Sequence, residues 1–384
     1  MKAIVWARLR PLANPASVGG GDHPSERSPS VRDNFRMKAA VLHAPGHVSA
    51  DDVVDPYVIV STDALVRVTA ACVCGSDLWP YRGVTDGRGR MGHEFVGVVE
   101  DVGAEVEGLR PGQFVIAPFV WSCGRCANCL AGWTTSCLIG GGYGGEDRDG
   151  HLVDGGQGQY VRVPQADGTL VPAPVEETDE RIPALLALSD VMGTGHHAAV
   201  SAGVTRGSTV AVVGDGAVGL CAVLAAHRLG AERIIALSTH EDRAELARRF
   251  GATDIVNARG DEAVDAVREL TDGLGAQSVC ECVGTTQTWN TALDAARPGG
   301  TVGYVGVPAG VAEGLPLRKM FGRNVSVRGG VAPTRVYLPE LLENVLAGTL
   351  DPGPVFTSTA ALTDIGRAYD DMDQRRSIKV LVKP

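Results

Sequence analysis

Four cysteines lie close together with the spacing of a metal-binding loop. They follow the pattern Cys-x2-Cys-x2-Cys-x7-Cys and are Cys123, Cys126, Cys129 and Cys137. Four neighbouring thiolates complete a tetrahedral zinc site and leave no coordination position open. Such a closed site stabilises the surrounding lobe and takes no part in chemistry. The spacing therefore predicts structural zinc; an iron–sulfur cluster, which uses the same thiolates, is the alternative.

A second group of side chains, separated in the sequence, has the donor types of a zinc site with an open position. Cys74, His93 and Asp190 offer one thiol, one imidazole and one carboxylate. These donors suit a zinc ion that keeps one position for a substrate, as catalysis requires. Asp77 could accept a hydrogen bond from the other nitrogen of His93 and fix its tautomer. Taken singly, each residue also has a structural interpretation as a core cysteine, a buried histidine or a helix cap.

A glycine-rich turn follows a predicted buried strand. Thr209–Val213 is apolar and mostly β-branched, as expected of a strand inside a parallel sheet. It leads into Gly214-x-Gly216-x-x-Gly219 and a predicted helix over 217–229. In this context the glycines allow a tight turn, approach of a pyrophosphate and close helix packing, and the helix N-terminus offers free N–H groups. We therefore predict a dinucleotide site. The absence of Gly-Lys-Ser/Thr argues against a nucleoside-triphosphate loop.

The end of the next predicted strand bears on which nicotinamide cofactor binds. NAD enzymes carry an acid there, about 20 residues past the glycines, for the ribose hydroxyls. This chain has hydroxyl and basic groups instead: Ser238, Thr239, His240 and Arg243. Such groups suit a 2′-phosphate, so the sequence favours NADP. NAD remains the alternative if Glu241 or Asp242 turns toward the ribose.

Two patterns of elements must position these groups. Short strands between Gly and Pro turns predict an all-β, barrel-like unit; they are Lys38–Leu42, Ala64–Ala71, Phe95–Val102, Gln113–Ala117 and Gln159–Val163. Helical segments then alternate with apolar strands, which predicts a parallel, doubly wound sheet; these strands are Ile234–Leu237, Asp254–Val256, Ser278–Cys282 and Thr301–Val305. A strand after Asn324, a helix over 337–346 and a closing strand over 378–382 complete the pattern.

Composition limits the class of protein. The 384 residues are more than one core usually holds, which predicts two domains. A net charge of −10 argues against nucleic-acid and anionic-membrane partners. No apolar run reaches the ~20 residues of a membrane span, and the apolar part of residues 1–10 is too short for a secretory signal. The clustered cysteines therefore favour metal over disulfides and predict a reducing cytoplasm. Residues 1–36 are predicted to be a disordered extension.

From Met37 onward the chain resembles the medium-chain zinc-dependent alcohol dehydrogenases. The resemblance rests on motifs in family order: Cys74-Gly-Ser-Asp, Gly92-His-Glu, the four-cysteine lobe, Asp190 before Thr194-Gly-x-His, the glycine turn and Ile378-Lys-Val. It implies an α/β protein in two parts. Residues 37–191 and 328–384 would form a β-rich, barrel-like (GroES-like) catalytic domain. Residues 192–327 would form a doubly wound Rossmann domain.

The resemblance also implies roles for individual residues at a catalytic zinc. Cys74, His93 and Asp190 would be its ligands, and Glu94 an alternate ligand. Many family members have cysteine in place of Asp190, and others have aspartate. Ser76 would bond the substrate oxygen and carry its proton.

Further roles concern the cofactor and the proton path. By resemblance, Thr194 would touch the nicotinamide and Lys379 the pyrophosphate. Some relatives have a histidine proton relay five residues after the zinc cysteine, where this chain has Trp79. Aromatic residues near the ligand motifs could wall an apolar pocket, Trp79 among them, together with Tyr81 and Trp121.

These implications converge on hydride transfer between NAD(P) and a small alcohol, aldehyde or ketone, in a homodimer or homotetramer. An NAD-dependent polyol or formaldehyde dehydrogenase is an alternative, because residues 189–197 are similar to glutathione-independent formaldehyde dehydrogenases. A non-catalytic nucleotide-binding redox sensor is the alternative from another class. The complete set of Cys74, His93 and Asp190 favours the enzyme. The acidic balance of the chain argues against a zinc-finger nucleic-acid binder.

Overall fold

Short strands make up the first part of the chain, as the sequence predicts. The computed structural model describes residues 36–308 and 314–384, so the predicted extension lies outside the described residues except for Arg36. The strands of this part are β1 (Arg36–Ala44), β2 (His47–Val54), β3 (Ala64–Cys72), β4 (Gly89–Arg90), β5 (Phe95–Val102), β6 (Phe114–Ala117), β7 (Val120–Trp121), β8 (Gly141–Gly142), β9 (Tyr160–Val163) and β10 (Val171–Pro172).

The largest sheet of this part has two strands from the C-terminal end of the chain at one of its edges. Its order is β10-β6-β5-β3-β18-β17, and β9 pairs with β3. The two late strands are β17 (Phe356–Ala361) and β18 (Lys379–Lys383). β18 pairs antiparallel with β3 through Leu381 and Cys72. β2, β1 and β4 form a smaller sheet, and a shared apolar core includes Leu42, Phe95 and Tyr369. The chain end therefore completes the barrel-like part that the first strands begin.

The middle of the chain forms a parallel sheet. Its strands are β11 (Thr209–Val213), β12 (Arg233–Leu237), β13 (Asp254–Val256), β14 (Ala276–Glu281), β15 (Ala296–Tyr304) and β16 (Ser326–Gly329). Their order is β13-β12-β11-β14-β15-β16, and every neighbouring pair is parallel. This is the doubly wound arrangement that the sequence predicts. The expected division at residues 327/328 falls inside β16, which pairs with β15 as far as Gly329.

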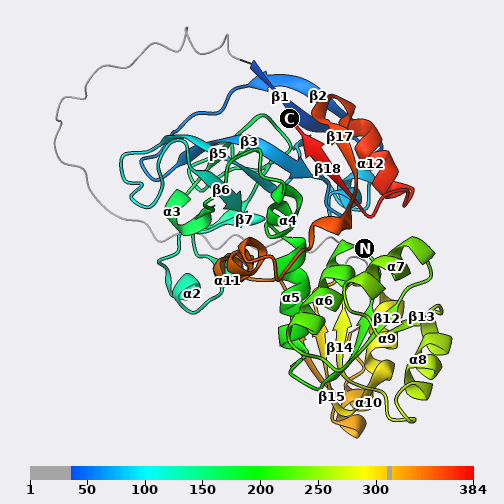
Figure 1. Cartoon of the computed structure of the whole chain (residues 1–384). Coiled ribbons are helices and arrows are strands. Elements are labelled where there is room, and N and C mark those ends of the chain that lie inside the picture. Colours follow the sequence, from blue (N-terminus) through cyan, green and yellow to red (C-terminus); the bar gives the residue numbers. More distant parts are fainter. Residues whose placement is uncertain (1–35, 309–313) are drawn as a thin grey trace, which may run out of the picture. The chain divides into compact units, whose positions relative to one another are not determined.

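Helices cover both faces of the parallel sheet (Figure 1). Val210 and Val212 of β11 face one apolar cluster, and Ala211 and Val213 face another. Burial on both faces explains why β11 is apolar throughout. The helices are α1 (Leu78–Tyr81), α2 (Ala127–Leu130), α3 (Ala166–Thr169), α4 (Ile182–Ala187), α5 (Val191–Ser201), α6 (Ala217–Arg228), α7 (Glu241–Arg249), α8 (Gly260–Glu269), α9 (Thr286–Ala295), α10 (Leu317–Arg323), α11 (Thr334–Leu346) and α12 (Ile365–Asp373). Within the described residues, no helix combines the length and apolarity that a bilayer crossing needs.

The glycine turn lies at the point where the strand order reverses. β11 has β12 on one side and β14 on the other, and ligands of doubly wound sheets bind at such a point. Gly214 has φ +117°, a backbone conformation that side chains other than glycine rarely adopt. A Cβ at Gly219 would stand 1.9 Å from the carbonyl oxygen of Gly214, whereas a Cβ at Gly216 would meet nothing within 4 Å. Gly219 therefore allows the start of α6 to pack closely against the glycine turn, and Gly216 leaves open space beside the turn.

These contacts predict different costs for two alanine substitutions. Gly219→Ala should lower the free energy of unfolding by about 2–3 kcal/mol, because backbone must move to admit the methyl group. Gly216→Ala is the matched control and should change it by less than about 0.5 kcal/mol. Urea unfolding followed by tryptophan fluorescence measures both. Equal stability of the two variants would contradict the packing role of Gly219.

Candidate zinc and dinucleotide sites

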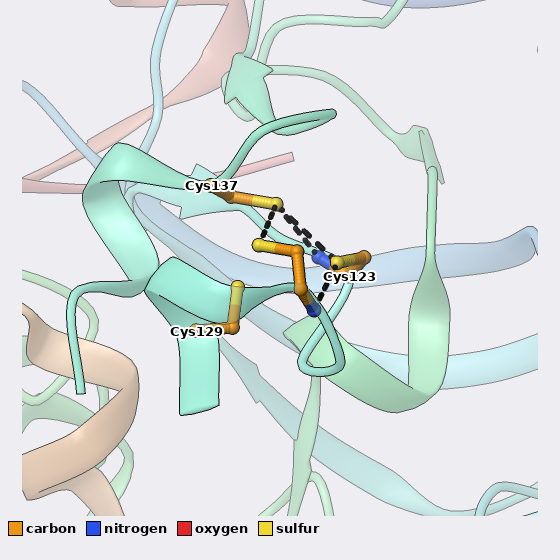
Figure 2. A group of neighbouring side chains, drawn as sticks. Cys123, Cys129 and Cys137 are labelled. Carbon is orange, nitrogen blue, oxygen red and sulfur yellow. Dashed lines mark hydrogen bonds between the residues drawn. The ribbon is translucent and has the colours of Figure 1, made fainter. Parts of the chain in front are cut away.

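The four clustered cysteines form a compact group of thiols. Cys129 lies in α2, Cys137 directly follows the 3-10 turn η2 (Thr134–Ser136), and Cys123 and Cys126 lie in the loop before α2. All four sulfurs lie within 4.8 Å of one another. Figure 2 shows the sulfurs of Cys123 and Cys137 turned toward each other, and these atoms are 3.5 Å apart. Zinc–sulfur bonds of about 2.3 Å give tetrahedral sulfur separations of about 3.8 Å, so the group fits a zinc ion.

Backbone groups of the lobe favour thiolates. The amide of Cys126 donates to the sulfur of Cys123, and the amide of Leu138 donates to the sulfur of Cys126. Hydrogen bonds from backbone, with that from Leu138 the largest cause, lower the pKa of Cys126 to about 6. Burial and the adjacent sulfurs raise the pKa of Cys129 to about 12. Crowded thiols of this kind compete for protons, and a divalent cation relieves the competition by binding all four as thiolates.

The second predicted ligand set also comes together. Cys74 follows β3, His93 and Glu94 precede β5, and Asp190 stands at the N-terminus of α5. Their ligand atoms all lie within 4.8 Å of one another. Asp190 Oδ2 is 3.8 Å from Cys74 Sγ and 3.7 Å from His93 Nε2. The four residues are thus placed to hold one metal ion, with an imidazole, a thiol and carboxylates as donors.

Asp77 orients two of these donors. Its Oδ1 lies 3.2 Å from His93 Nδ1, as the sequence leads us to expect, and its Oδ2 accepts from the backbone N–H of Cys74 at 2.9 Å. Gln157 donates to the same Oδ2 and accepts from the hydroxyl of Tyr369. Because Nδ1 is directed at Asp77, Nε2 of His93 is left to face Asp190. Burial opposes a charge on His93, but Asp77 and Cys74 raise its pKa well above the usual value.

Glu94 links the ligand cluster to the closing strand. Its Oε1 accepts from Lys379 Nζ at 2.6 Å, and Lys379 also donates to the carbonyl of Val73. Both charged side chains are almost completely buried. The other oxygen, Oε2, is buried without a hydrogen-bond partner among the described residues, so it is available to a metal ion. This setting differs from the predicted pyrophosphate contact of Lys379, because its ammonium group is enclosed and already paired.

Ser76 and Thr194 lie at the edge of the cluster. Ser76 Oγ is 3.5 Å from His93 Nε2, and Thr194 Oγ1 donates to Asp190 Oδ1 at 2.6 Å. Thr194 thereby holds the carboxylate; its contact with the nicotinamide stays a prediction. Phe119, which the sequence reading passed over, sets its ring edge-on to His93 with centroids 6.5 Å apart. An aromatic ring here gives the site an apolar side.

The other aromatic residues lie mainly in packing. Trp121 is 3% exposed and donates its indole N–H to the carbonyl of Gly142. Tyr81 stacks at a tilt on Tyr369 in the core of the barrel-like part. Trp79 is half-buried in α1. Trp121 and Tyr81 therefore stabilise the fold around the site, which differs from the predicted pocket role.

Three of the predicted cofactor residues meet an acid that the sequence reading did not single out. Ser238 Oγ donates to Asp215 Oδ2 at 2.9 Å, and His240 Nδ1 lies 3.2 Å from the same oxygen. Arg243 Nη1 lies 3.4 Å from Asp215 Oδ1. Asp215 is the residue between Gly214 and Gly216, so the glycine turn and the loop after β12 are joined here.

The remaining residue of this loop meets a second unforeseen partner. Thr239 Oγ1 accepts from Arg259 Nη2 at 2.8 Å. Arg259 directly precedes α8, 20 positions further along the chain. No local pattern marks Asp215 or Arg259, because only the parallel pairing of β11, β12 and β13 brings their loops to one edge of the sheet. These two contacts could have been predicted only if the order of the strands in the sheet had been known.

Comparisons with known proteins match both parts of the chain. Residues 60–175 match the family model described as an alcohol dehydrogenase GroES-like domain, and residues 217–347 match the zinc-binding dehydrogenase model. The chain is 35% identical over 372 residues to an alcohol dehydrogenase from Cupriavidus necator, covering 91% of this chain and 99% of that protein. The chain belongs to the medium-chain zinc-dependent alcohol dehydrogenases. It is an enzyme of that family, a zinc-dependent oxidoreductase, which excludes the sensor alternative.

Two further similarities concern the cofactor and the structure. The chain is 32% identical over 335 residues to the NADP-dependent isopropanol dehydrogenase of Thermoanaerobacter brockii, covering 84% of this chain and 92% of that one. The solved structure of the alcohol dehydrogenase TADH from Thermus sp. ATN1 has a TM-score of 0.82 and 33% identity, covering 90% of this chain and 99% of that chain. The alcohol dehydrogenase fold therefore extends over nearly all described residues.

The cysteine lobe predicts a selective loss of zinc. Cys137→Ser should reduce the zinc content by about one ion per chain and lower stability, because three thiolates hold the closed site less well than four. Cys282→Ser is the control, since Cys282 is a half-buried cysteine outside both ligand groups; its zinc content should be that of the unmodified protein. Elemental analysis of both dialysed variants measures this. An unchanged zinc content in Cys137→Ser would contradict the structural zinc site.

Proposed function

We propose that Cys74, His93 and Asp190, with Glu94 as an alternate ligand, hold the catalytic zinc of this oxidoreductase. The observation that carries the proposal is the convergence of four buried or half-buried ligand residues, whose ligand atoms lie within 4.8 Å of one another. The reaction we propose is hydride transfer between a small alcohol and NADP, forming an aldehyde or ketone, and its reverse. The NADP preference is supported by Ser238, Thr239, His240 and Arg243, and by the similarity to an NADP-dependent relative.

The chain's own residues would position the reacting groups. Zinc supplies Lewis acidity, and the nicotinamide supplies or accepts the hydride. Asp77 fixes the orientation of His93 and Cys74, and Thr194 fixes that of Asp190. Because these contacts are already formed, little reorganisation accompanies the reaction.

Ser76 would act on the proton of the substrate hydroxyl. Its hydroxyl reaches the ligand cluster, 3.5 Å from His93 Nε2, and a serine can accept one proton while donating its own. Trp79 occupies the position of the histidine relay in some relatives. An indole N–H donates only, so we propose that the proton leaves through Ser76 to the cofactor ribose or to water.

The setting we propose is a homo-oligomer, dimer or tetramer, in the cytoplasm. Every cysteine of the described part is free, in line with a reducing compartment. β16 is an edge strand of the parallel sheet, and the preceding α10 exposes Phe321 (88%) and Leu317 (71%). Unpaired strand edges beside exposed apolar side chains favour association with another copy.

Removal of a zinc ligand tests the proposed site. Cys74→Ala should lower turnover at least about 1,000-fold and remove about one zinc per chain, because the metal loses its thiolate and its Lewis acidity. Binding of NADPH, followed by its fluorescence, should stay within about threefold of the unmodified enzyme, since Cys74 lies outside the glycine turn. Turnover that survives in the zinc-depleted variant would exclude this role.

Substitution of Ser76 separates proton transfer from packing. Ser76→Ala should slow turnover about 10²-fold, in the range of general acid–base catalysis, with zinc content unchanged. Ser76→Thr keeps the hydroxyl and should recover most of the rate. Rapid-mixing measurements of NADPH formation over a pH series follow both variants. Equal rates for alanine and threonine would remove Ser76 from the proton path.

A further inference from the structure

The carboxylate of Asp215 lies among donors that come from the loop after β12. Ser238 and Arg243 are buried, and Asp215 is 19% exposed at its side chain. Ser238 and His240 share one carboxylate oxygen, and Arg243 approaches the other as well as the backbone carbonyl of Asp215. Ser238, His240 and Arg243 could together bind an anion of a ligand. The glycine turn instead places the carboxylate of Asp215 among them.

Asp215 is ionised in this arrangement. Burial would favour the neutral acid, but Ser238, Arg243 and His240 together lower the pKa of the carboxyl below its usual value. The charge of Arg243 is therefore offset inside the protein before any ligand arrives. A 2′-phosphate carries a charge of the same sign as Asp215, and like charges held close together oppose binding.

The acids that could serve NAD in the usual way point elsewhere. The side chain of Glu241 is 83% exposed and pairs with Arg248 of its own helix. Asp242 is exposed in the first turn of α7. A ribose-binding acid is expected in the loop after β12. The acid that lies beside this loop is instead Asp215, which belongs to the glycine turn.

We propose that Asp215 sets the choice between NADP and NAD, because it occupies as an internal anion the donors that a 2′-phosphate needs. This rests on the proposed function, in which Ser238, His240 and Arg243 receive that phosphate. NADPH must displace Asp215 from these donors or bind against its charge, and NADH need not. Asp215 therefore restrains a preference for NADPH that the surrounding basic groups would otherwise make stronger.

Arg259 adds a second cation to the same place. It donates to Thr239 from the loop before α8, and no acid pairs with it among the described residues. Unlike Arg243, its charge is thus not offset within the protein. We assign Arg259 to the phosphate-binding group as the contact that favours NADPH while Asp215 holds Arg243.

The test is Asp215→Asn, titrated by calorimetry with NADPH and with NADH. Asparagine keeps the shape and an acceptor for Ser238 but removes the charge. Affinity for NADPH should rise at least about tenfold and affinity for NADH should change less than about threefold. An unchanged ratio of the two affinities, or a fall in NADPH affinity, would overturn the proposal.

Asp242→Asn is the matched control, because it also removes one carboxylate charge, here from the first turn of α7. Among the described residues, no hydrogen bond or ion pair joins the Asp242 side chain to the three donors. The ratio of its NADPH affinity to its NADH affinity should stay within about threefold of the ratio in the unmodified enzyme. A rise as large as that in Asp215→Asn would show that any nearby negative charge has this effect, and would overturn the specific role of Asp215. Arg259→Gln should weaken NADPH about tenfold and leave NADH unchanged, and equal weakening of both would contradict its assignment. If the unmodified enzyme bound neither cofactor, the proposed function would fail; binding of both with no response to Asp215→Asn would overturn this inference alone.

Discussion

The catalytic centre that we propose depends on anionic donors that lie within a few ångströms of one another in the interior of the protein. Cys74, Glu94 and Asp190 bring a thiol and two carboxylates into one small volume, with His93 beside them and Lys379 behind Glu94. Burial of charge is costly unless each charge is paired. Lys379 forms an ion pair with Glu94 alone among these acids, and Glu94 Oε2 has no partner among the described residues. We therefore propose a divalent cation as the partner that makes this arrangement favourable.

Chain topology brings these donors together from distant positions. The C-terminal strand β18 lies beside β3, so Lys379 reaches the residues that follow β3. The same logic applies in the parallel sheet, where the loops after β11, β12 and β13 meet at one edge. Cofactor choice, as we propose it, is therefore decided by contacts between loops that are 20 or more residues apart.

Much of this could be predicted from residue types and spacing. Cysteine spacing, the glycine turn and alternating strands are local patterns with few physical interpretations, and the four-cysteine cluster and the doubly wound sheet follow from them. The set of Cys74, His93 and Asp190 is spread along the sequence, and its prediction as one zinc site depended on the family resemblance. The contacts of Asp215 and Arg259 could not be predicted, because they depend on which loops the strand order makes neighbours. Lys379 shows a different limit: the motif places a basic residue there, but only the packing of β18 against β3 reveals that Glu94 already pairs with it.

Replacement of zinc by cobalt is the most direct test of the central claim, because cobalt absorption reports on the ligands of each site. The account predicts two cobalt spectra, one from an all-thiolate site and one from a site with a single thiolate, an imidazole and a carboxylate. Addition of an alcohol in the presence of NADP should alter only the second spectrum, and Cys74→Ala should abolish it. A second spectrum that is absent, or that does not respond to alcohol and cofactor, would contradict a catalytic zinc site at Cys74, His93 and Asp190.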